Sequence, residues 1–189
     1  DWSSDVCSSD LIRADVLQVP LVTACTVFEN VTGAVDGDGL PSKSIEVLVS
    51  GGADQAIRDA IWKSKGGGIE TYGSTSGTAL DSQGVAHTIK FSRPMDKLVY
   101  LDVSIKVDAA TFPADGDAQI IAALAARTFS AGEDVVAWQL KKLITVSGVL
   151  DVPALEIGLS AWPASEATLA IASRELAKLD TGRIRVTHV

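Results

Sequence analysis

The sequence predicts an α+β fold made of two small domains of mostly antiparallel sheet, with helices packed on one face. Several segments alternate apolar and polar side chains with a period of two between Gly- and Asp-rich turns, which is typical of strands. Other segments repeat their apolar residues at helical spacing. The expected order is ββαββ over residues 12–94 and βααββ over residues 95–189.

Two strands joined by a polar loop open the first expected domain. Residues 16–31 are rich in apolar and β-branched side chains, which favour a strand. Residues 33–41 consist mainly of turn-forming residues and predict a loop. In residues 44–52 apolar side chains alternate with polar ones up to a pair of glycines, which indicates a second strand. Because the connection is short, we expect the two strands to pair antiparallel.

A helix and a hairpin complete this domain. Residues 53–65 place apolar side chains at helical spacing, with Asp54 in the first turn and lysines in the last. Gly66–Gly68 end that helix. A hairpin follows, with its turn at Asp81–Gly84, where the glycine tolerates a positive φ. Pro94 closes the domain.

The second expected domain begins with the clearest strand of the chain. Residues 97–108 alternate, so that one face suits a core and the other suits water or a partner. The loop FPADGD then leads into a helix, with Asp115 or Asp117 as its N-cap. A second helix is expected after Gly132, where acidic residues precede a repeat of apolar ones. Further strands are expected at residues 149–157 and 184–188.

Residues 1–11 differ in composition from the rest of the chain. The segment DWSSDVCSSDL is rich in Ser and Asp, and it has neither the basic start nor the apolar centre of a signal peptide. Its back-translation resembles a sequencing-adapter oligonucleotide read in frame. We therefore expect an artefactual, disordered segment, with a genuine disordered leader as the alternative. On this interpretation the natural start lies upstream and the chain is an N-terminally truncated fragment.

Charge and cysteine content narrow the classes of function. The net charge is −8, and an acidic balance argues against a nucleic-acid surface, because phosphate contacts need clustered Lys and Arg. No apolar run approaches the roughly 18 residues of a membrane span. Without residues 1–11, Cys25 is the single cysteine, so the core rather than a disulfide is expected to hold the fold. We expect a soluble globular protein without nucleic-acid or membrane partners.

Histidine and cysteine give little sign of catalysis. His87 shares a strand face with Ile89 and Phe91, which favours a packed or edge histidine over a catalytic base. His188 lies next to the last residue, where chains commonly fray. Cys25 lies in an apolar strand and is expected to be inert. One cysteine and two distant histidines do not match zinc-ligand spacing.

The aspartates and glycines also favour structural roles. Asp36 and Asp38 resemble part of a calcium loop, but its twelfth position is a valine instead of a glutamate, so a turn is expected. Asp115 and Asp117 are expected to be helix caps. Gly66–Gly68 end a helix, whereas the glycines of a phosphate loop open one. We predict no enzyme, and no catalytic, cofactor-binding or metal-binding residue, cofactor or small-molecule substrate.

Three tryptophans remain as candidates for packing or binding. Trp62 and Trp138 lie in predicted helices, where a core position is the favoured interpretation. Trp162 stands beside Pro163 in a Ser- and Ala-rich context and is the better interface candidate.

Several stretches together resemble one family. They are FENVTGAVDGDGLPSKSIEVLVSGG, DQAIRDAIWKSKGGGIETYGSTS, DSQGVAHTIKFSRP, the strand–FPADGD–helix segment and, near the end, VSGVLDV and ASRELAKLDTGRIRVT. In this order they are similar to baseplate J-like proteins of Mu-like phages. The resemblance spans residues 12–189, and its motifs are structural rather than catalytic. Gly66–Gly68 stand where that family is expected to have a proline-bearing turn, which should loosen the loop.

The resemblance implies a wedge component of a contractile tail baseplate, in a phage or a phage-like injection system. Such a protein acts by binding wedge and hub subunits, in several copies arranged as a ring. It would be located in the virion baseplate, after assembly in the bacterial cytoplasm. Two alternatives remain. One is a carbohydrate-active tail module with a carboxylate pair, either Asp36 with Asp38 or Asp115 with Asp117. The other is a glycan-binding module.

Overall fold

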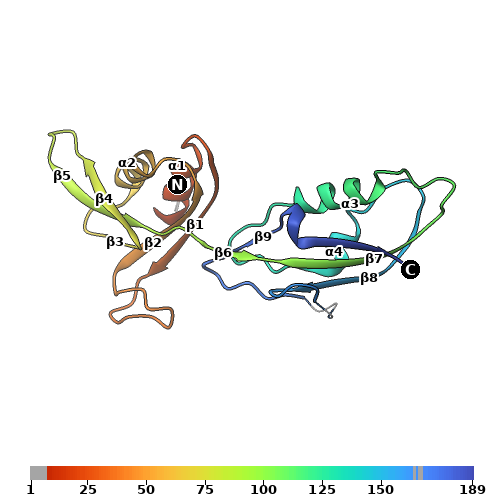
Figure 1. The fold of residues 1–189 in the computed structure, drawn as a ribbon. Coiled ribbons are helices and arrows are strands. Elements are labelled where there is room, and N and C mark those ends of the chain that lie inside the picture. Colours follow the sequence, from red (N-terminus) through yellow and green to blue (C-terminus); the bar gives the residue numbers. More distant parts are fainter. Residues whose placement is uncertain (1–7, 164, 166–167) are drawn as a thin grey trace, which may run out of the picture. The chain divides into compact units, whose positions relative to one another are not determined.

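The chain forms two compact units, residues 1–94 and residues 95–189, in a computed structural model that describes residues 8–163, 165 and 168–189. The division falls after Pro94, where the sequence indicates a boundary. Both units combine short sheets with helices (Figure 1), and the predicted α+β class is confirmed.

The first unit consists of helices and strands that surround one core. Its described elements are α1 (Ser8–Leu17), β1 (Val22–Asn30), β2 (Ser44–Gly51), α2 (Asp54–Ser64), β3 (Glu70–Tyr72), β4 (Thr75–Leu80) and β5 (Ala86–Phe91). Strands β1, β2 and β3 form one sheet in that order, and β4 pairs with β5 as a hairpin. The antiparallel pairing predicted for β1 and β2 is confirmed, from Val22 opposite Gly51 to Asn30 opposite Ser44.

Helix α1 corrects two expectations. Residues 8–11 were expected to be disordered and Val16 to begin a strand, but Ser8–Leu17 is helical and β1 starts only at Val22. Ile12 and Val16, one turn apart, are fully buried in the core of this unit, and this burial holds the helix in place. The Ser64 hydroxyl of α2 also donates a hydrogen bond to Asp15. Residues 1–7 of the expected artefactual segment lie outside the described residues.

The core of the first unit forms between α1, α2 and the strands. Helix α2 is one residue shorter at each end than the predicted 53–65, and it has the predicted buried stripe, with Ile57 and Ile61 fully buried. They pack in one cluster with Val47 and Val49 of β2 and with Phe91 of β5. The predicted hairpin is also confirmed, and Gly84 in its turn has a φ of 81°.

The second unit is built around a three-stranded sheet. Its described elements are β6 (Met95–Leu98), β7 (Tyr100–Val107), α3 (Gly116–Ala125), α4 (Ala137–Lys141), β8 (Val149–Gly158), β9 (Glu175–Lys178), the short 3-10 helix η1 (Thr181–Arg183) and β10 (Ile184–His188). The sheet order is β10-β7-β8, and β6 pairs with β9. The antiparallel ladders β1–β2, β4–β5 and β7–β8 are the longest, while the shorter ladders β2–β3, β6–β9 and β7–β10 are parallel and were not predicted.

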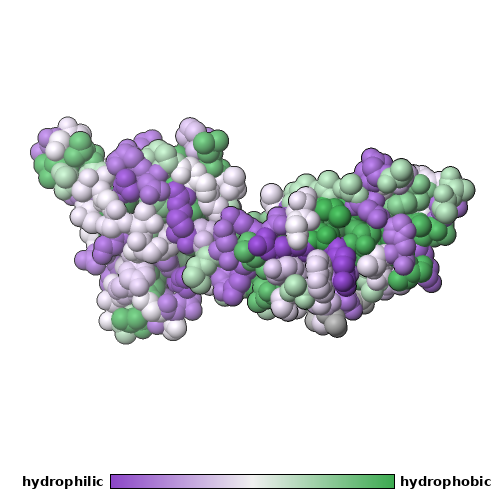
Figure 2. All heavy atoms as spheres, in the orientation of Figure 1, coloured by the Kyte–Doolittle hydropathy of each residue, from purple (hydrophilic) through white to green (hydrophobic). Residues whose placement is uncertain are grey.

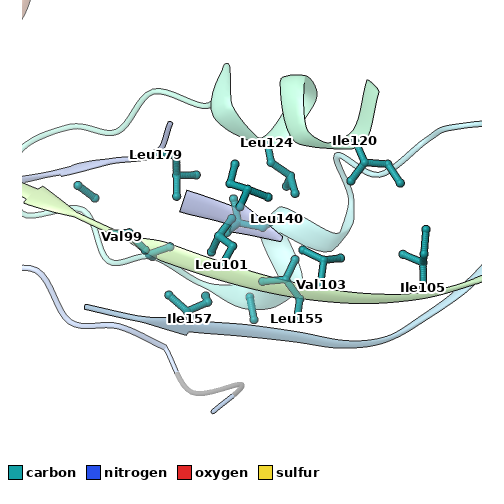
Figure 3. Packing of buried hydrophobic residues seen from close by; sticks show 14 of the residues in the cluster. Val99, Leu101, Val103, Ile105, Ile120, Leu124, Leu140, Leu155, Ile157 and Leu179 are labelled. Atoms are coloured by element: carbon teal, nitrogen blue, oxygen red, sulfur yellow. The ribbon is translucent and has the colours of Figure 1, made fainter. Parts of the chain in front are cut away.

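Both helices of the second unit pack on the same face of this sheet. Leu101 and Val103 of β7 point toward Ile120 and Leu124 of α3, and Leu140 of α4 lies in the same cluster (Figure 3). These side chains are almost fully buried. The alternation predicted for residues 97–108 therefore has its apolar face in the core. The opposite face of the sheet carries the polar side chains of β7.

The helix expected after Gly132 is shorter than predicted. Only Ala137–Lys141 is helical. The reason lies just before it, where the backbone of Val135 exchanges two hydrogen bonds with Leu169, at 3.0 and 2.9 Å. This isolated bridge holds Val135 in an extended conformation, so the helix cannot begin earlier.

Candidate functional site

The most concentrated group of polar and aromatic side chains lies where α2 meets the β4–β5 hairpin. Trp62 of α2 stacks on His87 of β5, with ring centroids 4.0 Å apart and an interplanar angle of 13°. The Lys65 ammonium lies over the Trp62 ring, 4.9 Å from its centroid. Trp62 also packs against the core of the unit, in line with its predicted core position.

Asp81 joins this group to the hairpin turn. Its Oδ2 lies 3.1 Å from Nε2 of His87, and its Oδ1 accepts backbone N–H groups of Gln83 and Val85. The hydrogen bond with His87, followed by those from Val85 and Gln83, lowers the pKa of the Asp81 carboxyl. His87 therefore lies between a helix and a turn, with one ring nitrogen engaged.

Two open hollows adjoin Trp62. The larger, of about 610 Å³, lies toward Asp59, Lys63 and Asp81. The smaller, of about 320 Å³, is lined by Trp62, Lys65, Ile69, Glu70, Thr71, His87, Thr88 and Lys90. Gly66 and Gly67, which follow α2 as predicted, line the larger hollow.

A second group lies on the outer face of the β10-β7-β8 sheet. Arg185 of β10 binds Asp102 of β7 through both carboxylate oxygens, with Nε 3.0 Å from Oδ1. The bond to Asp102 raises the pKa of Arg185. Trp162 stacks over Arg185, with 4.7 Å between the guanidinium carbon and the ring centroid. Its backbone has a φ of 55°, in the left-handed region that a tryptophan rarely adopts.

The structure brings together two residues that the sequence treated separately. Nε2 of His188, near the end of β10, lies 2.8 Å from Oδ1 of Asp117 in the first turn of α3. Phe112 meets the His188 ring edge-on, with centroids 5.4 Å apart. Asp115 stands at the N-cap position of α3, as one of the two predicted alternatives. Its side chain accepts a hydrogen bond from Gln119 and makes no capping bond to a backbone amide of the first turn.

Structural roles explain the positions of three further candidate residues, Asp36, Asp38 and Cys25. Oδ1 of Asp36 accepts the backbone N–H groups of Asp38 and Leu40, both at 2.9 Å, as in the predicted turn. Cys25 is buried, and burial raises the pKa of its thiol to about 11, which disfavours the reactive thiolate. Within the described ranges, no group of three or more His, Cys, Asp or Glu side chains is placed to hold a metal ion.

The exposed tryptophans differ in part from the expectation. Trp138 was predicted in the core, but it is 56% exposed, with the Lys142 ammonium 4.0 Å from its ring centroid. The short helix α4 buries Ala137 and Leu140, so Trp138 points away from the core. Trp162 is 48% exposed, as suits the predicted interface candidate.

Sequence reasoning missed the contacts that define both groups. Trp62 and His87 are far apart in the chain, and Arg185 and Asp102 are 83 positions apart. The alternation of residues 97–108 predicts the polar face of β7, but no local pattern in the sequence predicts that β10 pairs beside it in parallel. Apolar side chains also gather at the tip of the β4–β5 hairpin (Figure 2). Leu80 and Val85 at this tip are more than half exposed, which the sequence did not predict.

No protein-family model matches the sequence, and no curated protein matches it either. Within the described part of the chain, no helix is both long and apolar enough to cross a membrane.

Proposed function

We propose that this chain is a structural component of a contractile tail baseplate, from a phage or a phage-like injection system. It acts in wedge assembly by binding other wedge and hub subunits, in several copies around a ring, and not by catalysis. Its site of action is the virion baseplate, after assembly in the bacterial host cytoplasm. The motif resemblance, which extends through both units, supports this assignment.

The observation that carries the proposal is the outer face of the β10-β7-β8 sheet. Helices α3 and α4 pack on the inner face, so the outer face presents Trp162 and Arg185, with Asp102 beneath the Arg185 side chain. Tyr100 adds a second aromatic ring, 5.6 Å from the Arg183 guanidinium carbon. Tryptophan, tyrosine and arginine are the residue types most enriched at the energetic centres of protein interfaces.

The same face is already ordered before any partner binds. Asp102 is only 8% exposed although it lies on the outer face, because the Arg185 side chain covers it. Trp162 in turn covers the Arg185 guanidinium. Side chains held in place by each other lose less conformational entropy on binding than free ones, which favours association.

Co-purification with subunits encoded by neighbouring tail genes tests the proposal. We expect the intact chain to bind a wedge or hub subunit and Trp162→Ala to weaken that binding at least tenfold, as truncation of an interface centre does. Trp138→Ala is the matched control, because Trp138 is about as exposed as Trp162, at 56% against 48%, and also lies beside a cation, but belongs to the helical side of the unit. It should bind as the wild type does.

Two results would contradict the assignment. One is that no tail subunit binds the intact chain. The other is a complete reading frame that is flanked only by metabolic genes. Equal binding by the two tryptophan variants would show that the interface does not include Trp162 on the outer sheet face.

A carbohydrate-active tail module is the second candidate. The carboxylates considered for it are held in different units, Asp36 and Asp38 between β1 and β2, and Asp115 and Asp117 at the start of α3. Asp36 serves its own turn and Asp117 binds His188. If the chain cleaves a glycan, alanine at all four aspartates should abolish cleavage, and unchanged activity would exclude these pairs.

A further inference from the structure

A third hollow, of about 360 Å³, lies between the β1–β2 ladder and the glycine turn that follows α2. Its volume is at the lower end of the range for small-molecule sites, which combine apolar walls with a few polar groups. Ile45 and Ile69 line it and also pack in the core cluster of the first unit. Val31 lines it as well and is 62% exposed, so the protein leaves this apolar side chain uncovered. The hollow therefore offers apolar contact to a small ligand.

The glycine turn adds backbone without side chains to the rim. Gly67 and Gly68 both line the hollow. A methyl group built on either glycine would meet no atom within 4 Å, so the space beside the turn is open. A ligand can therefore approach the backbone at this point without displacing a side chain.

The register of the β1–β2 ladder places a carboxylate on the same side as the apolar surface. Glu29 is directly opposite Ile45, and directly opposite residues of an antiparallel pair project from the same face. Val27 and Cys25, earlier on that face of β1, belong to the core cluster. Glu29 is exposed and lines the hollow. Its carboxylate therefore lies where the core face of the sheet opens to solvent.

An ammonium group lies at the same rim. Nζ of Lys43 donates a hydrogen bond to the carbonyl of Val31, and both residues line the hollow. An ammonium group has three donors, so two remain for a ligand. The side chains of Asn30 and Ser44, which also line the hollow, already donate to carbonyl groups of the β1–β2 connection. Recognition of charged ligand groups therefore falls to Glu29 and Lys43.

We propose that this hollow binds a zwitterionic α-amino acid with an aliphatic side chain. The α-ammonium meets the Glu29 carboxylate, and the α-carboxylate accepts hydrogen bonds from Lys43. The aliphatic side chain lies against Ile45 and Ile69. A simple carboxylate is repelled by Glu29 and a simple amine by Lys43, so the opposite charges of the rim favour a zwitterion over either. The hollow lies wholly within the first unit, so this inference is separate from the assembly role, and either can hold without the other.

Titration of the intact chain with L-leucine, followed by backbone amide chemical shifts, tests this inference. We expect shifts at Ile45, Gly67 and Ile69. Isovalerate, isopentylamine and glycine each lack one of the three recognised groups, and each should bind about fivefold more weakly than leucine. N-acetyl-leucine amide keeps the aliphatic side chain but carries neither charge, and it should also bind more weakly.

Two variants with matched controls locate the charged contacts. Glu29→Gln should weaken the binding of leucine and isopentylamine about fivefold and leave isovalerate binding no weaker. Lys43→Gln should weaken leucine and isovalerate and leave isopentylamine no weaker. Such opposite changes in ligand preference do not follow from a general loss of structure. The controls are Asp59→Asn and Lys63→Gln, at exposed positions of α2 that do not line this hollow, and both should leave the affinity for leucine unchanged.

Several outcomes would overturn the inference. The first is an absence of leucine shifts. Binding of isovalerate or isopentylamine as tight as that of leucine would show that one of the two charges has no role. Equally tight glycine would exclude the apolar contact, and equally tight N-acetyl-leucine amide would indicate an aliphatic side chain of a partner protein instead. Losses in the two α2 variants as large as those at Glu29 and Lys43 would place the ligand elsewhere.

Discussion

Asn30 organises the long connection between β1 and β2 through four hydrogen bonds. Its amide Nδ2 donates to the carbonyls of Ala34 and Leu40, each at 2.8 Å. Its Oδ1 accepts from the backbone N–H and the hydroxyl of Thr32, at 3.0 and 2.7 Å. The side chain is almost completely buried. One buried side chain thus adds a second partner to the carbonyls of Ala34 and Leu40, which also accept the Thr32 hydroxyl and the Asp36 backbone N–H.

Removal of the Asn30 amide should therefore destabilise the first unit. We expect Asn30→Ala to lower the free energy of unfolding by about 2–3 kcal/mol, because the loop loses the four hydrogen bonds of a buried side chain. Urea unfolding followed by circular dichroism measures the change. The control Thr23→Ala removes an exposed hydroxyl of β1 and should cost less than about 0.5 kcal/mol. A similar small effect at both positions would contradict the role given to Asn30.

Asp81 should make the first unit sensitive to acid. Because His87 and two backbone N–H groups lower the pKa of Asp81, its folded carboxyl holds a proton less tightly than the unfolded one. Its contribution to stability is complete above the ordinary carboxyl pKa of about 3.9, and is lost as the pH falls through the lowered value. We expect Asp81→Asn to melt below the wild type at pH 7 and the gap to narrow near pH 2. A gap independent of pH would refute this coupling.

Helix α1 shows how an element is decided by its neighbours. Its sequence is Ser- and Asp-rich at the start, and composition alone favoured a disordered segment. The helix is nevertheless anchored because Ile12 and Val16 fit the core beside α2. An isolated helix of ten residues is marginal in water, so tertiary packing supplies most of its stability.

Two substitutions in α1 separate packing from helix propensity. Ile12→Ala should destabilise the first unit by about 2–4 kcal/mol, because it leaves a cavity under the helix. Leu11→Ala changes a half-exposed neighbour and should cost less than about 1 kcal/mol. Thermal or urea unfolding of both variants gives the comparison. If both changes are nearly silent, α1 does not pack on the core in solution.

Elements with strong local patterns were predicted well. Helix α2, the β4–β5 hairpin and β7 follow from periodicity and turn residues, because α2, β5 and β7 each bury one regular face. Helix α4 was predicted too long because Val135 pairs with Leu169, a partner that local pattern cannot reveal. Strand β3 is only three residues long and exists through its parallel pairing with β2, so no periodicity marks it.

The whole molecule consists of two units with separate cores. One cluster of buried residues draws on α1, α2, β1, β2, β4 and β5, and the other draws on the elements after Pro94. A domain with its own core is able to fold alone. Each unit is therefore expected to have its own free energy of unfolding.

Residues 95–189 should fold as an isolated fragment. We expect strand and helix signals in circular dichroism and one cooperative transition in urea, since the fragment keeps its complete cluster of buried residues. The folding of the fragment should depend on its last residues, because β10 is the last strand of the chain and pairs with β7 in the sheet. Deletion of residues 184–189 from the fragment provides the control and should abolish the transition. A broad, non-cooperative transition in the uncut fragment would contradict the prediction.

The sequence by itself determined the α+β class, the antiparallel pair β1–β2, the hairpin and the buried face of β7, because these features repeat over a few residues. Only the tertiary structure decided that Ser8–Leu17 is an ordered helix and that β2, β6 and β7 have the parallel neighbours β3, β9 and β10. It also decided the contacts of Trp62 with His87 and of Arg185 with Asp102. Those contacts join residues distant along the chain. Their free energy depends on burial and pairing, which a local pattern does not contain.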